Sequence, residues 1–143
     1  MAFPSPCIIR NAHSARRLYA QEEKVKMDGV GASNGDFFDD QKWYIEDAGD
    51  GTYTIRNFYS GRRLYAESNK GWEDGVGATS SVVVNDDQKW TIERRGDGTY
   101  TICNFHSARR LYAQGNKGWE QGVGALSGDF FADQTWLIES ARQ

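Results

Sequence analysis

Two polar segments of the chain each hold one tryptophan among side chains that donate and accept hydrogen bonds. One reads Asn69-Lys70-Gly71-Trp72-Glu73, and the other reads Asn116-Lys117-Gly118-Trp119-Glu120. An indole face packs against the C–H side of a pyranose ring, while nearby amide, ammonium and carboxylate groups bind its hydroxyls. We therefore predict two sugar-binding sites, formed by Asn69, Lys70, Trp72, Glu73, Asn116, Lys117, Trp119 and Glu120. The alternative is that both indoles fold back as lids over the end of the core.

The corresponding segment near the start of the chain, residues 21–29, lacks this chemistry. Lys26 stands at the position of the tryptophan, and Glu23 stands at the position of the asparagine. Because the aromatic face and the amide are both missing, we expect this segment to bind sugar weakly or not at all.

All three segments belong to a threefold internal repeat, in which equivalent positions lie 46 or 47 residues apart. Each unit holds three landmarks in the same order: Asn-x-x-Ser-x-Arg-Arg-Leu-Tyr-Ala, then Gly-Val-Gly-Ala, then Gln-x-Trp. The first landmark begins at Asn11, Asn57 and Asn104, and the last ends at Trp43, Trp90 and Trp136. Three units, 1–47, 48–94 and 95–143, use the whole chain, so we predict one domain over residues 1–143.

Within a unit, apolar and polar residues alternate with the period of two that is typical of β-strands. Four short strands per unit give twelve strands, and one unit cannot bury its own apolar face. We therefore predict an all-β protein with the β-trefoil fold, a six-stranded barrel capped by three hairpins. A propeller is the rival architecture, but three blades are fewer than propellers typically have. The expected core consists of Ile9, Leu18, Val30, Trp43, Ile45, Ile55, Leu64, Val76, Trp90, Ile92, Ile102, Leu111, Val123, Trp136 and Ile138.

The composition limits the partners of such a protein. The chain has 143 residues, 13% of them aromatic, and a formal net charge of −3. Polyanion binders are normally basic, so we do not expect nucleic acid as a partner. No apolar run is long enough to insert in a membrane and no signal peptide is visible, so we expect a cytoplasmic protein, with non-classical secretion as the alternative. Cys7 and Cys103 are the two cysteines, and we expect no disulfide between them.

The three Gln-x-Trp motifs and the run Ser60-Gly61-Arg62-Arg63-Leu64 resemble the ricin B-type lectins. The resemblance implies a β-trefoil that binds sugars, usually one per repeat, without catalysis. In that family the second strand of a unit usually ends in an aspartate that binds a galactose-type sugar. This sequence has Tyr19, Tyr65 and Tyr112 at that position. The resemblance therefore supports the fold and the general class of ligand, and it does not extend to galactose.

These tyrosines form the second candidate site. They alternate with buried leucines, so we expect them to point outward together with Arg17, Arg63 and Arg110. An outward pair of Tyr65 with Arg63, or of Tyr112 with Arg110, could bind the carboxylate or sulfate of an acidic glycan. The alternative, which we favour, is that each arginine pairs with the acid before Gln-x-Trp, namely Asp40, Asp87 or Asp133.

A third candidate is the loop before Gln-x-Trp. It carries Phe37-Phe38 in the first unit, Val83-Val84 in the second and Phe130-Phe131 in the third. Adjacent aromatic residues cannot both face the core, so one of each pair could contact a ligand or a protein partner. We favour packing of these rings under the loop.

Catalysis has little support in the sequence. His13 and His106 occupy a turn position where the second unit has Tyr59, and no His, Cys or Asp cluster has metal-ligand spacing. We predict a lectin without catalytic residues, metal or cofactor, which binds glycans or glycoconjugates at two or three sites and acts multivalently in recognition or agglutination. The alternative is a β-trefoil for protein–protein interaction, of the actin-bundling, cytokine or protease-inhibitor kind. The sugar, the number of sites and the formation of a homo-oligomer are left open.

Overall fold

The computed structural model describes residues 3–20, 30–33, 37–66, 76–80, 83–113, 123–126 and 130–141. Its strands are β1 (Cys7–Asn11), β2 (Arg17–Ala20), β3 (Val30–Ser33), β4 (Trp43–Gly49), β5 (Thr52–Asn57), β6 (Arg63–Ala66), β7 (Val76–Thr79), β8 (Trp90–Arg94), β9 (Tyr100–Asn104), β10 (Arg110–Ala113), β11 (Val123–Leu126) and β12 (Trp136–Ser140). Three short 3-10 helices precede the fourth strand of each unit: η2 (Asp39–Gln41), η4 (Asp86–Gln88) and η6 (Ala132–Gln134). No helix in these ranges is long and apolar enough to span a membrane.

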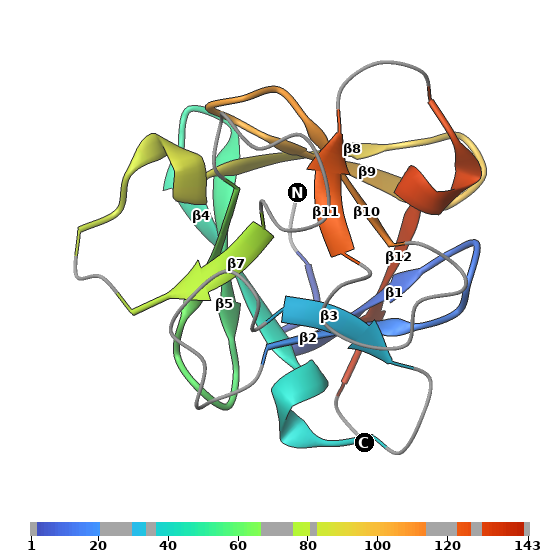
Figure 1. Ribbon diagram of the computed structural model, residues 1–143, viewed down its shortest axis with the longest axis horizontal. Coiled ribbons are helices and arrows are strands. Elements are labelled where there is room, and N and C mark those ends of the chain that lie inside the picture. The colour runs from blue at the N-terminus through green and yellow to red at the C-terminus, as the bar shows by residue number, and fades with distance from the viewer. Residues whose placement is uncertain are drawn as a thin grey trace.

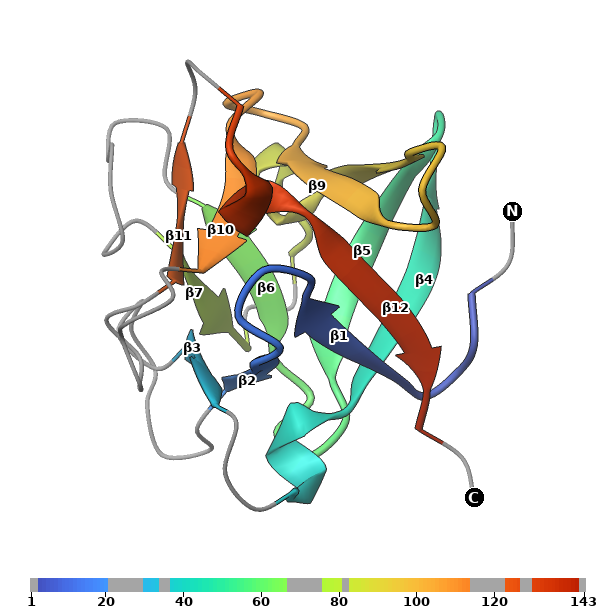
Figure 2. The ribbon, with the colours of Figure 1, turned by 90° about the vertical axis from the view of Figure 1, so that its right-hand side faces the viewer.

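Six strands close into a barrel by antiparallel pairing in the circular order β1, β4, β5, β8, β9 and β12. The other strands pair as three hairpins, β2 with β3, β6 with β7, and β10 with β11. Figure 2 shows these hairpins at one end of the barrel, and the N-terminal segment lies toward the other end. In Figure 1 the hairpins surround the central axis, and the three short helices lie at the periphery. The prediction of a β-trefoil with twelve strands is confirmed.

The core contains the residues expected from the repeat, with two exceptions. Ile45 and Ile138 are only partly buried and pack against the rest of the cluster. The three Gln-x-Trp tryptophans are fully buried. Each indole Nε1 donates to the backbone carbonyl of a leucine on the second strand of the same unit, at 2.9 Å for Trp43 and at 3.0 Å for Trp90. The tryptophan therefore fills the core and ties the fourth strand of its unit to the second.

The second-strand tyrosines do not all point outward, so that prediction is wrong. Tyr19 is 7% exposed and Tyr112 is 6% exposed, whereas Tyr65 is partly buried. All three tyrosines face a glycine on the third strand of their unit, namely Gly31, Gly77 and Gly124. The register therefore does not explain why Tyr65 is the more exposed of the three.

The end of the barrel near the N-terminus departs from threefold symmetry. Tyr53 faces Trp90 across the strands, Tyr100 faces Trp136, and Cys7 occupies the equivalent position facing Trp43. The ring of Phe3 packs edge-on against Tyr53 and Tyr100, with centroid distances of 5.3 and 5.8 Å. Phe3 thus supplies a third ring where the first unit has a small thiol. Cys7 is buried, Cys103 is half-buried, and both are free.

Candidate functional site

Each unit meets the next at a junction built by one buried asparagine. At junction A, formed by η2 and the turn 57–60, the Asn57 side chain donates through Nδ2 to the backbone carbonyl of Asp40 at 2.9 Å. Its Oδ1 accepts from the backbone N–H groups of Tyr59 and Ser60, both at 3.0 Å. The N–H of Phe58 also donates to the Lys42 carbonyl at 2.8 Å. One side chain therefore shapes the turn and fixes it to the helix of the preceding unit.

The same arrangement recurs at two further junctions. Junction B joins η4 to the turn 104–107, where Asn104 donates to the Asp87 carbonyl at 2.9 Å. Junction C joins η6 to the turn 11–14, where Asn11 donates to the Asp133 carbonyl at 2.9 Å. The backbone frame is thus common to all three junctions, and the side chains that line it can differ.

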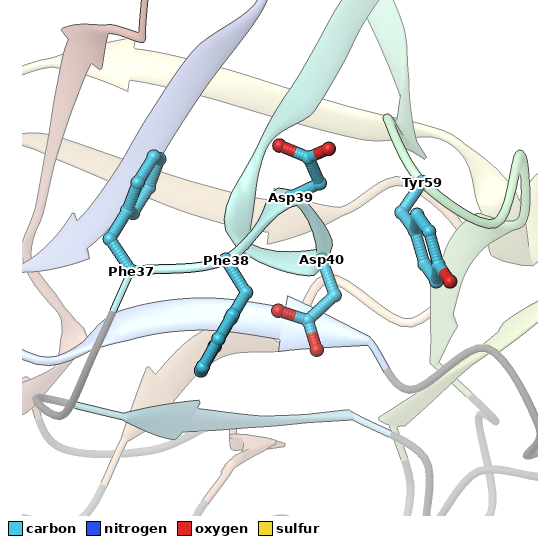
Figure 3. Close-up of a pocket in the computed structure, with 5 residues that line it drawn as sticks. All are labelled: Phe37, Phe38, Asp39, Asp40 and Tyr59. Atoms are coloured by element: carbon cyan, nitrogen blue, oxygen red, sulfur yellow. The ribbon is translucent and has the colours of Figure 1, made fainter.

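Junction A holds a pocket of about 520 Å³, lined by Phe37, Phe38, Asp39, Asp40 and Tyr59. Figure 3 shows the Asp40 carboxylate between the rings of Phe38 and Tyr59, while Asp39 points to the opposite side of the helix. The two rings are exposed to solvent, Phe38 at 61% and Tyr59 at 55%. The pocket therefore combines two accessible aromatic surfaces with one carboxylate between them.

Asp39 already has a cation as its partner. The Lys42 ammonium lies 3.0 Å from Asp39 Oδ1. The same ammonium lies 5.6 Å from the ring centroid of Phe37 and 5.2 Å from that of Phe58. Such contacts hold a cation through the negative faces of the rings. This cluster orients Phe37 and neutralises Asp39 on the side away from Asp40.

Asp40 is in a different environment. Its Oδ1 is buried and accepts no hydrogen bond, and among the described residues no ion pair includes this carboxylate. Burial, followed by the negative charge of Asp39, raises the pKa of Asp40 above its usual range. Oδ1 itself has almost no surface open to a ligand, so a ligand hydroxyl or ammonium would bond the carboxylate where Asp40 lines the pocket.

The arginines of the second strands do not pair with the acids before Gln-x-Trp, which corrects the ion-pair alternative. Instead, Arg63 Nε donates to Gln88 Oε1 at 2.8 Å, and Arg110 Nε donates to Gln134 Oε1 at 2.6 Å. Arg17 makes the same contact with Gln41. The glutamine of the motif therefore links the helix to the second strand and leaves the preceding aspartate to other partners. Because these arginines are engaged and two of the tyrosines are buried, the acidic-glycan interpretation of this strand loses its geometric basis.

Junctions B and C have the same frame and a different lining. Aligned on the Gln-x-Trp motif, Asn85 takes the place of Phe38 at junction B, and His106 takes the place of Tyr59. Asp87 keeps the position of Asp40, and its Oδ1 is also buried without a hydrogen-bond partner.

At junction C, Phe131 keeps the aromatic ring, 55% exposed, while Ala132 replaces the first aspartate. Burial raises the pKa of Asp133, and the nearby His13 opposes that shift. Of the three junctions, junction A has the fullest set of aromatic and acidic groups.

The expected packing of the paired loop residues under their loops is wrong. Both members of each pair are exposed, including Phe37 at 42% and Phe130 at 42%. At junction C, Phe130 carries the Arg95 guanidinium 4.4 Å from its ring centroid and the Arg110 guanidinium 5.7 Å away. The first ring of each Phe pair is thus held by cations, and the second faces solvent.

The first sugar-site prediction falls on residues outside the described ranges: Asn69, Lys70, Trp72, Glu73, Asn116, Lys117, Trp119 and Glu120. Of the remaining predicted contacts, Tyr65 lies on β6 and Tyr112 lies on β10. The sequence pattern alone does not place Tyr59 beside the loop before Gln-x-Trp. The usable signal was the shared asparagine of the turn, which sets the position of Tyr59 beside the preceding unit.

Comparison with known proteins agrees with this fold. Residues 39–126 match the family described as ricin-type beta-trefoil lectin domain-like. The match covers more than half of the chain, and the chain belongs to this family. Membership supports carbohydrate binding in general. No curated protein sequence matches the chain.

Solved structures show the same fold. The designed threefold-symmetric protein ThreeFoil superposes with a TM-score of 0.82 at 24% identity, covering 94% of this chain and 97% of that one. A salivary protein from Culex quiquefasciatus of the cysteine and tryptophan-rich family gives a TM-score of 0.77 at 25% identity, covering 98% of this chain and 96% of that one. SeviL, solved bound to asialo-GM1 saccharide, gives 0.74 at 19% identity, covering 95% and 97%.

Proposed function

We propose that the chain is a non-catalytic lectin and that junction A holds one sugar ring. The observation that carries this proposal is the placement of the Asp40 carboxylate between the exposed rings of Phe38 and Tyr59 (Figure 3). Aromatic faces pack against the C–H side of a sugar, and a carboxylate accepts from its hydroxyls. One such site would supply about 4–5 kcal/mol of binding free energy, which corresponds to a millimolar to sub-millimolar Kd.

The threefold frame supports more than one site on each molecule. Junctions A, B and C lie at separate positions around the axis, where the short helices mark them in Figure 1. On a dense glycan surface, weak sites on one body act together through effective concentration. We expect junction A to bind best, because junction B lacks the first aromatic ring and junction C lacks the second.

The tryptophan loops remain a second set of proposed sugar contacts. Trp72 and Trp119 follow the second strands of their units in the sequence, and the asparagine, lysine and glutamate beside each of them supply the amide, ammonium and carboxylate groups that a sugar needs. Their contribution is separable from that of junction A, because the residues involved are different.

A glycan array followed by calorimetric titration of the best glycan tests the proposal. Phe38→Ala and Tyr59→Ala should each weaken binding at least fivefold, and the matched junction B variants Asn85→Ala and His106→Ala should change it less than twofold. Trp72→Ala and Trp119→Ala should each remove about one site per chain while leaving the melting temperature nearly unchanged, and Lys26→Ala should do neither. Full glycan affinity in all the Phe38, Tyr59, Trp72 and Trp119 variants would refute the assignment of these sites.

A further inference from the structure

We infer that junction A selects a sugar with a free amino group, such as a glucosamine unit, over its neutral or N-acetylated counterpart. This inference rests on the proposed lectin function and names the substrate class of its best-formed site. The charged partner on the protein is the Asp40 carboxylate, and the ammonium of the sugar would lie between Phe38 and Tyr59.

The charge balance of the pocket favours a cation. Asp39 and Asp40 are adjacent carboxylates, and Lys42 compensates only the first. A hydroxyl would give Asp40 a hydrogen bond and leave its charge uncompensated. An ammonium would give it a charge-assisted hydrogen bond, which is about twice as strong as a neutral one.

The protein already binds one ammonium group, that of Lys42, between a carboxylate and two aromatic rings near η2. There the Lys42 ammonium contacts one carboxylate and the faces of two aromatic rings, Phe37 and Phe58. Beyond Phe37 and Asp39, which Lys42 already contacts, the pocket is lined by one carboxylate and two aromatic rings, Asp40, Phe38 and Tyr59, and no lysine is among the described residues of its lining. The contacts of the Lys42 ammonium therefore serve as an internal example of how Asp40, Phe38 and Tyr59 would bind an ammonium group.

Junction B provides the matched comparison. Asp86 pairs with Lys89 at 3.3 Å, as Asp39 pairs with Lys42, and Asp87 has the same unpartnered oxygen as Asp40. The acids are thus alike at the two junctions. The aromatic rings differ, since Asn85 and His106 stand where junction A has phenylalanine and tyrosine. A cation attracted only by the acids would bind both junctions equally, whereas one that also needs the rings would prefer junction A.

The test compares two oligosaccharides of equal length by calorimetric titration, glucosamine tetramer and N-acetylglucosamine tetramer. At about pH 6 an amine is protonated and an ordinary aspartate is ionised, and a bound ammonium beside Asp40 favours the ionised form of that carboxyl. We expect the amine form to bind about tenfold more tightly, with an advantage that decreases as salt is added. Asp40→Asn should reduce the ratio of the two affinities to about one, while Asp87→Asn should leave the ratio unchanged.

A gain of binding provides a second readout. The double variant Asn85→Phe with His106→Tyr gives junction B the two rings that flank the acid at junction A, with Val84 still in the place of Phe37, so it should add one amine-selective site per chain. Asp40→Asn keeps the backbone contact with Asn57, and its circular dichroism spectrum should match that of the parent.

The possible failures are distinguishable. Equal binding of the two oligomers at junction A, or an amine preference that persists in Asp40→Asn, overturns the inference and leaves the lectin proposal standing. Absence of binding for both oligomers and for every arrayed glycan overturns the lectin proposal itself. A lysine peptide that competes as strongly as the glucosamine tetramer would also overturn the inference, because the site would then bind any amine and not select an amino sugar.

Discussion

Replacing Asn57 by alanine tests whether one buried side chain holds both the fold and the pocket at junction A. Asn57 is fully buried, and its removal leaves the Asp40 carbonyl and the N–H groups of Tyr59 and Ser60 without their partners. At about 1 kcal/mol for each net hydrogen bond, and somewhat more for a group left unsatisfied, the loss is about 3–4 kcal/mol. For a domain of this size, the melting temperature should fall by about 6–12 °C.

Asn104→Ala is the matched control, because Asn104 makes the equivalent bonds to Asp87, His106 and Ser107. Thermal and urea unfolding at pH 7 should show nearly equal destabilisation of the two variants. Calorimetric titration below their melting temperatures should show loss of the junction A site in Asn57→Ala and near-normal binding in Asn104→Ala. A destabilisation below about 1 kcal/mol in Asn57→Ala would refute the structural reasoning. Equal loss of binding in both variants would refute the assignment of the site.

Three further predictions concern the core, a thiol and a carboxylate. Trp90→Ala should destabilise the protein by about 3–5 kcal/mol in urea unfolding, because the fully buried indole also bonds the Leu64 carbonyl; a loss under about 1 kcal/mol would contradict its core role. Burial raises the pKa of Cys7 to about 12, so its thiol should resist a thiol reagent at about pH 8 in the native protein, while two thiols react in urea; fast native labelling of Cys7 would contradict this. The raised pKa of Asp40 means that its contribution to stability is present at low pH and lost as the pH rises through the folded-state pKa. Asp40→Asn should therefore melt above the parent at pH 7 and no higher than the parent near about pH 3, and the opposite order would disprove the burial argument.

The fold could be predicted from the sequence because the same three motifs recur in the same order in each of the three units. The spacing of the Gln-x-Trp motifs located the barrel strands, and the alternation of apolar residues selected the core. The alternation failed at Tyr19 and Tyr112, because a period of two gives the side of the strand on which a ring lies and not what covers that side in the folded chain. The packing of Phe3 into the barrel end could not be predicted from the repeat. Phe3 has no equivalent in the other two units, and its ring stands in for the tyrosine that Cys7 replaces in the first unit.

The pocket at junction A was only half visible in the sequence. The paired phenylalanines are visible in the sequence as an aromatic feature, but the contacts of Arg17 and Lys42 with the face of the Phe37 ring form only in the folded chain. Tyr59 belongs to the next unit, and its approach depends on the hydrogen bonds of Asn57, a long-range contact that periodicity does not encode. The unpartnered oxygen of Asp40 is a property of the folded environment, so residue type alone could not reveal it.

The buried asparagines give this small protein three junctions with the same backbone frame, at which the surface side chains can be exchanged independently. Each asparagine holds its junction through the same bonds to backbone atoms, whichever side chains surround it. After a gene segment is triplicated, mutation can therefore rewrite the surface of one copy without loosening that copy or disturbing the other two. The chain shows this outcome already, with an acidic aromatic lining at one junction, a polar one at the second and a mixed one at the third. A molecule built this way can change its ligands by exchanging a few surface residues. The fold does not limit these exchanges, because the bonds of the asparagines to the backbone stay in place.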